Sequence, residues 1–158
     1  MSSPNDKFLY LFEEFLNKIL LVCPNDRLNN YRKGFLALKI ASPTTPVNLF
    51  MAGCLDYKVH IKNRDENFFI NSEQIKKSVT NFTDDFGINK HWNNFSDATK
   101  TAVWDYVQSL FVLGEVIINS KPKDFEKFSN LYSSDYKKEI SNLHGENFSV
   151  EFISKINS

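Results

Sequence analysis

Apolar residues recur at spacings of three and four along most of the chain, which is the pattern of an amphipathic α-helix. The first such stretch covers residues 4–22, and its apolar face consists of Phe8, Phe12, Phe15, Ile19 and Val22. The second covers residues 25–41, and its apolar stripe consists of Leu28, Tyr31, Phe35 and Leu38. Because only a short break around Pro24 separates them, the two stretches predict an antiparallel helical hairpin.

Prolines mark the next helix boundary. Thr45 is suited to cap a helix and Pro46 to occupy its first position, so we expect a third helix here. Its apolar residues are Val47, Phe50, Met51, Cys54 and Leu55. Residues 57–61 alternate between apolar and polar, but a single strand would have no partner in this chain. We therefore expect the end of the third helix there, or an extended segment.

Short elements follow. Residues 63–66 are polar and predict a loop, and residues 68–70 predict one short helical turn. Ser72 then begins a further predicted helix that continues to Phe82.

The clearest helical pattern covers residues 97–119. Ser96 is suited to be its N-cap, and Pro122 interrupts the chain shortly after its end. Trp104 and Tyr106 lie at the flanks of the predicted buried stripe. The stripe itself consists of Val103, Val107, Leu110, Phe111, Gly114 and Ile117.

The fold class that follows is all-α, a compact single domain over residues 1–158 with about six to eight helices. It is built on the N-terminal hairpin and on the helix near 97–119. Residues 1–118 form the core, and residues 119–158 form a C-terminal extension with short apolar pairs. Aromatic side chains dominate the energetics of such a core, so we expect four of them to be largely buried. These are Phe12, Phe35, Trp104 and Phe111.

Composition narrows the function classes. The chain has 19 basic and 19 acidic residues, so its net charge of zero argues against a generally basic coat for nucleic acid. No apolar run approaches the roughly 18 residues of a membrane span. Cys23 and Cys54 are too few for a disulfide framework, and no secretory signal precedes them. We expect free thiols in a reducing compartment.

No pattern of catalytic or metal-ligating residues emerges. His60, His91 and His144 lack second ligands at the spacing that zinc sites require. Asp84 and Asp85 are adjacent, and neighbouring residues of a helix point in different directions. The glycines are isolated, so none forms a phosphate-binding loop. The expectation is a non-enzymatic protein without a metal or cofactor.

Basic residues of the second helix and of the segment behind it are the candidate nucleic-acid contacts. They are Arg27, Arg32, Lys33, Lys39, Lys58, Lys62 and Arg64. Phosphate binding needs several cations on one side of a surface. On the second helix only Lys33 points directly away from the apolar stripe, whereas the other three cations flank the stripe on both sides. The alternative is therefore an ordinary solvated helix face.

Residues 61–71 contain an acidic pair followed by two phenylalanines, an apolar residue and asparagine. This segment resembles a recurrent one in small uncharacterised helical proteins of nucleocytoplasmic large DNA viruses, the giant viruses. The resemblance covers about residues 5–118. Its other matching segments are Pro24–Leu28 with Tyr31, Ser42-Pro43, Lys90–Trp92, Lys100, Trp104–Tyr106 and Leu110–Leu113.

The resemblance implies a protein encoded by a giant-virus type of genome. It implies no catalytic residues. We expect a non-enzymatic helical protein that binds a macromolecular partner, either a host or a viral protein, and self-association stays open. The alternative is a DNA- or RNA-associated protein of the virus factory or host nucleus. The expected location is the host cytoplasm or virus factory, with the nucleus and the virion as further options, and not outside the cell.

Overall fold

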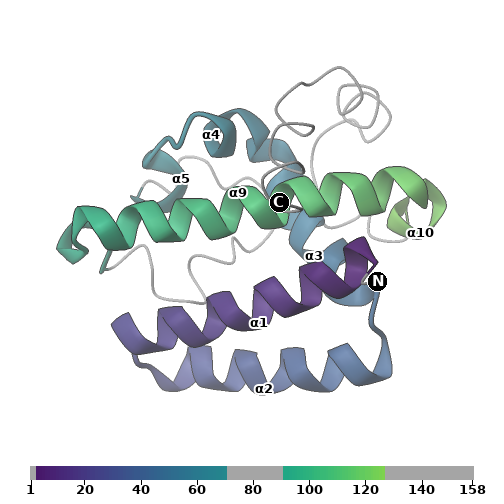
Figure 1. Ribbon diagram of the computed structural model, residues 1–158, viewed down its shortest axis with the longest axis horizontal. Coiled ribbons are helices and arrows are strands. Elements are labelled where there is room, and N and C mark those ends of the chain that lie inside the picture. Colours follow the sequence, from purple (N-terminus) through teal and green to yellow (C-terminus); the bar gives the residue numbers. More distant parts are fainter. Residues whose placement is uncertain (1–2, 71–90, 127–158) are drawn as a thin grey trace.

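The computed structural model describes residues 3–70 and 91–126, and every element in these ranges is helical (Figure 1). The all-α prediction is confirmed. The predicted helix 72–82 and residues 127–158 of the predicted C-terminal extension lie outside the described residues. The helices are α1 (Pro4–Val22), α2 (Asp26–Ala41), α3 (Thr45–Cys54), α4 (Lys58–Lys62), α5 (Asn67–Ile70), α9 (Asp97–Ser120) and α10 (Pro122–Glu126), with 3₁₀ turns at Leu55–Tyr57 and Trp92–Asn94.

Side-chain caps begin the three long helices where the sequence places polar residues. Ser3 Oγ accepts a hydrogen bond from the Asp6 amide at 3.1 Å, and the Asp6 carboxylate accepts one from the Ser3 amide. Asn25 Oδ1 accepts from the Leu28 amide at 2.7 Å, which starts α2 one residue later than predicted. Ser96 Oγ accepts from the Thr99 amide at 3.1 Å. Each cap satisfies an amide that has no partner within its helix.

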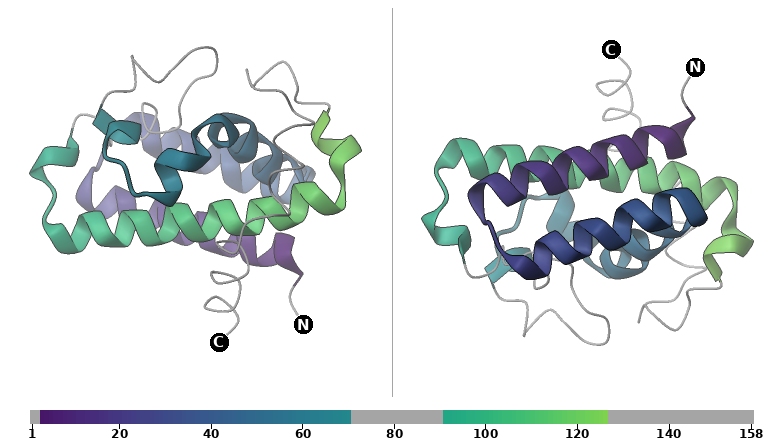
Figure 2. Two further views of the ribbon diagram at one scale, coloured as in Figure 1. Left: turned by 90° about the horizontal axis from the view of Figure 1, so that it is seen from above. Right: turned by 90° about the horizontal axis from the view of Figure 1, so that it is seen from below.

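Helix α1 lies between α2 and α9, antiparallel to both (Figure 1). Its most extensive packing is against α9, and α3 packs on α9, α2 and α1. The turned views place α1 along α9 and α2 on the side of α3 and α4 (Figure 2), and α3 packs against both α2 and α9. The predicted hairpin is therefore present, and α9 connects it to the remaining helices.

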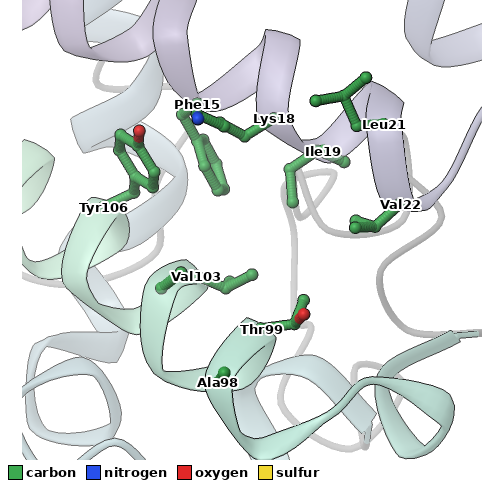
Figure 3. Close-up of a pocket in the computed structure, with 10 residues that line it drawn as sticks. Phe15, Lys18, Ile19, Leu21, Val22, Ala98, Thr99, Val103 and Tyr106 are labelled. Atoms are coloured by element: carbon green, nitrogen blue, oxygen red, sulfur yellow. The ribbon is translucent and has the colours of Figure 1, made fainter.

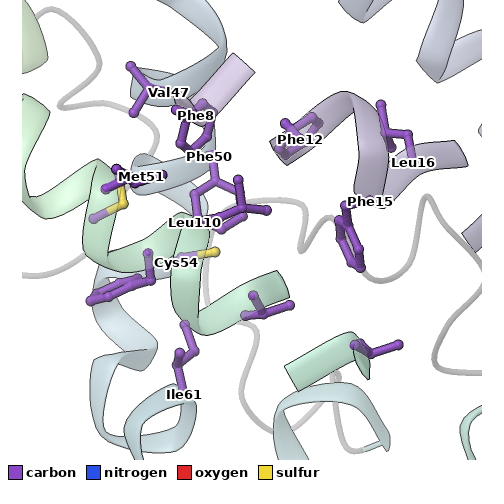
Figure 4. Packing of buried hydrophobic residues seen from close by; sticks show 14 of the residues in the cluster. Phe8, Phe12, Phe15, Leu16, Val47, Phe50, Met51, Cys54, Ile61 and Leu110 are labelled. Carbon is purple, nitrogen blue, oxygen red and sulfur yellow. The ribbon is translucent and has the colours of Figure 1, made fainter. Parts of the chain in front are cut away.

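Aromatic rings fill the contact between these layers (Figure 4). Phe8 meets Phe50 of α3 edge-on, with ring centroids 5.5 Å apart, and Phe12 lies 5.0 Å from Phe35 of α2. Such aromatic pairs are worth about 0.5–1.5 kcal/mol beyond their buried area. The four expected anchors are all buried, which confirms that prediction: Phe12, Phe35, Trp104 and Phe111.

Three expectations need correction. Val22 is 45% exposed because it is the last residue of α1 and the chain turns inward only at the buried Cys23. Tyr31 is 36% exposed because it stands at the open edge between α2 and α3. Thr45 is the first residue of α3 and not its cap, because Thr44 occupies the N-cap position, where no side-chain hydrogen bond forms. At residues 57–61 the helical one of the two expected alternatives is present, as a 3₁₀ turn that continues into α4.

Both cysteines carry free thiols, as the sequence predicts, and both are buried. Burial raises the pKa of the Cys23 thiol, and it raises that of Cys54 well above its usual value. Neither thiol is therefore activated as a nucleophile by its surroundings.

One ion pair is buried where α4 packs against α9. Lys58 Nζ lies 3.2 Å from Glu115 Oε2, and the two side chains are 9% and 3% exposed. Removing one partner of a buried pair leaves the other charge without compensation, whereas replacing both by apolar residues of similar volume is often neutral.

We predict that Glu115→Ala lowers the free energy of unfolding by about 3–5 kcal/mol, because the Lys58 ammonium then stays buried without its carboxylate. The double variant Lys58→Met with Glu115→Leu should recover most of this loss. Urea unfolding of both variants beside the wild type measures the difference. Equal destabilisation by the single and double variants would contradict the prediction.

Candidate partner-binding grooves

A groove of about 390 Å³ lies between α2 and α3. Helix α3 leaves α2 through a tight turn in which the Ser42 and Thr45 hydroxyls lie 2.6 Å apart. Tyr31, Gly34 and Leu38 follow one another at helical spacing on α2 and form one wall. The described residues that line the groove are Phe12, Tyr31, Gly34, Phe35, Leu38, Pro46 and Leu49.

Gly34 keeps this groove open. A Cβ atom at this position would meet nothing within 4 Å. Below it the Phe12 ring lies 5.0 Å from Phe35 and 6.5 Å from Tyr31, so the floor is aromatic. Leu49 is 40% exposed at the α3 edge. A glycine in a helix interior costs roughly 0.5–1 kcal/mol relative to alanine, and no close packing at Gly34 offsets that cost.

A second apolar groove of about 390 Å³ lies between the end of α1 and the beginning of α9 (Figure 3). Leu21, which is 77% exposed, and Val22 form its α1 rim, and the small side chains of Ala98 and Ala102 face them from α9. The rest of its lining consists of Phe15, Lys18, Ile19, Thr99, Val103 and Tyr106.

Tyr106 contributes a phenol group to the lining of this second groove. Its hydroxyl donates to Glu14 Oε1 at 2.7 Å. Burial, reinforced by the Glu14 carboxylate, raises the pKa of Tyr106 above its usual value. The phenol therefore stays protonated near neutral pH and acts as a tether between α9 and α1, not as an acid or base.

Two of the candidate phosphate contacts on α2 bind α1 instead. Arg32 Nε donates to Asn17 Oδ1 at 2.6 Å, and Lys39 Nζ lies 3.1 Å from Glu13 Oε1. Both cations flank the buried stripe on the α1 side, as their helical positions predict.

Lys58 and Arg64 hold α4 against α9. Lys58 is buried with Glu115, so this candidate is wrong as a surface contact. Arg64 lies two residues after the end of α4 and has a φ of 52°, and its guanidinium lies 2.5 Å from Asp105 Oδ1 and 3.0 Å from Gln108 Oε1. The network continues because Gln108 Nε2 donates to the Ile61 carbonyl at 2.9 Å. These side chains stabilise the fold.

Arg27, Lys33 and Lys62 are the exposed members of the seven candidates. The structure does not bring them to one surface, because α4 packs against α9 and α2 packs against α1, at the two ends of the arrangement in Figure 1. The sequence predicts neither groove. The available signal for the α2–α3 groove is Gly34, which lies between Tyr31 and Leu38 on α2.

Within residues 3–70 and 91–126, no three histidine, cysteine or acidic side chains gather as metal ligands would. In the same part of the chain α9 is long and apolar enough to cross a membrane by length and composition alone, but most of that stretch is buried in the protein, as in the core helix of a soluble protein. Comparisons with protein families, curated proteins and solved structures found no match to this chain.

We predict opposite effects for the same substitution at two helical glycines. Gly34→Ala should raise the free energy of unfolding by about 0.5–1 kcal/mol, because its Cβ enters open space. Gly114→Ala should lower it by about 1–3 kcal/mol, because its Cβ would meet the buried Met51 side chain. Chemical denaturation measures both, and a destabilised Gly34→Ala would show that the α2 edge is closed.

We also predict that Arg32→Ala combined with Lys33→Ala changes DNA affinity by less than about threefold, since the two side chains do not converge on one face. Fluorescence anisotropy with duplex DNA at fixed salt measures the change. A tenfold loss with the fold intact would favour nucleic-acid binding instead.

Proposed function

We propose that this protein acts without catalysis, by binding a protein partner in the α2–α3 groove. The observation that carries the proposal is the open space at Gly34 between two partly exposed apolar side chains of the groove, Tyr31 at 36% and Leu49 at 40% exposure. Large apolar side chains open to solvent and set into a cavity are the usual anchors of protein interfaces. The cavity volume is within the range of ordinary ligand pockets, which accommodates a few large side chains.

A non-enzymatic role is supported by the chemistry of the two grooves. Among the residues that the structure describes, those that line the α2–α3 groove include no charged side chain, and the α1–α9 groove contains Lys18 beside the tethered phenol of Tyr106. Such surfaces recognise apolar groups and lack the converging acid, base or nucleophile of an active site.

The cellular context of the proposal rests on the resemblance to giant-virus proteins over about residues 5–118. The partner is accordingly a host or viral protein in the infected cell, met in the cytoplasm or the virus factory. The nucleus and the virion are further sites where such a partner is available.

A nucleic-acid-associated role is the second candidate. It is favoured by α2, which has four basic residues and one acidic residue. It is second because Arg32 and Lys39 are directed to α1 and leave Arg27 and Lys33 on different faces of the helix.

Three matched variants test the proposal. Leu49→Asp places a charge at the α2–α3 groove, Leu21→Asp does so at the α1–α9 groove, and Ile40→Asp does so on an exposed residue outside both. We expect Leu49→Asp to reduce capture of partners from nuclease-treated lysate of infected cells at least about tenfold, because a buried unpaired charge is costly. Quantitative mass spectrometry measures capture.

The controls decide where partners bind. Ile40→Asp and Leu21→Asp should change capture by less than about twofold, with unchanged melting temperatures for all three variants. Loss of partner capture with Leu21→Asp alone would place the binding site in the α1–α9 groove. Capture that nuclease abolishes would favour the nucleic-acid role.

A further inference from the structure

The α1–α9 groove combines a projecting side chain with open space. Leu21 is 77% exposed at its α1 rim (Figure 3), and Tyr10, about three turns earlier on α1, is 69% exposed. On the other wall, Ala98 and Ala102 of α9 have small side chains and are themselves exposed. A large apolar group therefore stands out on one helix, and the neighbouring helix leaves room for such a group.

A two-fold axis brings these two features together. Helices α1 and α9 are antiparallel, and Leu21 lies at the same position along them as Ala98 and Ala102, because all three line one groove (Figure 1). An axis that runs between the two helices and parallel to them carries α1 of one copy over α9 of the other without a shift along the helices. Leu21 of each copy then lies over Ala98 and Ala102 of the other. The surface is therefore self-complementary, as a two-fold interface requires.

The charges of this surface are complementary in the same arrangement. Lys18 lines the groove on α1 and is exposed. Asp105 follows Ala102 by three residues on α9, so the two are neighbours on the helix surface, and its side chain is 63% exposed. Asp105 accepts from Arg64 through Oδ1, and a carboxylate has about four acceptor positions on its two oxygens. The two-fold axis brings Lys18 of each copy beside Asp105 of the other, and opposite charges meet twice.

The size of the surface sets the strength of the contact. The outer face of α1 from Tyr10 to Val22 and that of α9 from Ala98 to Ser109 are each about 20 Å long, and two helices side by side are about 20 Å wide. The contact area is then roughly 400 Å² per copy and roughly 800 Å² in total, which is the size of a weak and transient interface. Such a contact forms only as the protein concentration rises.

We infer that the outer face of α1 and α9 binds a second copy of this chain and forms a transient two-fold dimer, with four helices in the contact. Leu21 of each copy enters the groove of the other, and Lys18 pairs with Asp105 across the interface. The described residues that line this groove include none of those that line the α2–α3 groove, so the inference is independent of the proposed function.

Sedimentation velocity of the full chain between about 1 and 300 µM tests the dimer. We expect a monomer at the low end and a growing dimer at the high end, with a Kd of about 10–100 µM, since interfaces of this size are weak. Leu21→Asp should weaken the dimer at least about tenfold, because it places a charge in an apolar contact. Ile40→Asp makes the same change on an exposed residue outside both grooves and should alter the Kd by less than about twofold.

A second variant separates a fitted contact from unspecific association of apolar surfaces. Ala102→Trp adds apolar area to an exposed position, so unspecific association should increase, whereas a fitted contact should weaken at least about tenfold because the indole fills the space that Leu21 of the second copy needs. An unchanged melting temperature at low concentration shows that the monomer is intact. Lys18→Glu should weaken the dimer at least about threefold, and Lys33→Glu, the same charge change on the exposed side of α2, by less than about twofold.

Several results would overturn the inference. They are a chain that stays monomeric over the whole range, a dimer that Leu21→Asp leaves unchanged, and stronger association of the Ala102→Trp protein. A dimer that Leu49→Asp dissolves in place of Leu21→Asp would locate the contact at the α2–α3 groove and also contradict it.

The two proposals fail separately. If Leu21→Asp dissolves the dimer while Leu49→Asp leaves partner capture unchanged, the dimer stands and the proposed function fails. If the chain stays monomeric while Leu49→Asp removes the captured partner, the proposed function stands and the dimer fails.

Discussion

The structure depends on the enclosure of α9 by its neighbours. Six consecutive residues of this helix, from Leu110 to Glu115, are buried, so this stretch is covered all round and not on one face. Helices α1, α3, α4 and α10 supply that cover. At Gly114 the α3 side chain of Met51 lies against the helix backbone, and the next residue, Glu115, needs Lys58 of α4. The close contact at Gly114 and the compensated charge of Glu115 thus lie within one turn of α9.

The sequence predicted the helices because their signals are local. Caps such as Ser3 and Ser96 and the spacing of apolar residues are properties of neighbouring positions, and the structure reproduces α1, α3 and α9 almost residue for residue. The two grooves were not predictable in this way. They depend on the angle at which α3 leaves α2 and on the side chains that α9 presents to α1, which are set by tertiary packing.

The basic residues illustrate the same limit. A helical wheel correctly places Arg32 and Lys39 beside the apolar stripe of α2. It does not reveal that their partners, Asn17 and Glu13, lie on α1. The sequence makes Arg64 a candidate nucleic-acid contact, whereas in the structure it follows α4 and joins Asp105 and Gln108 across a sequence separation of about forty residues. A cation is therefore assigned to a ligand or to the fold only when its partners in space are known.

Helix α2 packs mainly on α1 and α3, with Leu28 and Phe35 as its buried side chains. It is held by far less apolar contact than α9, so its amides open to solvent by local fluctuations at a lower free energy than those of the central helix. A segment that fills the open side of α2 would suppress these fluctuations. Part of the free energy of such binding would therefore be spent on ordering α2.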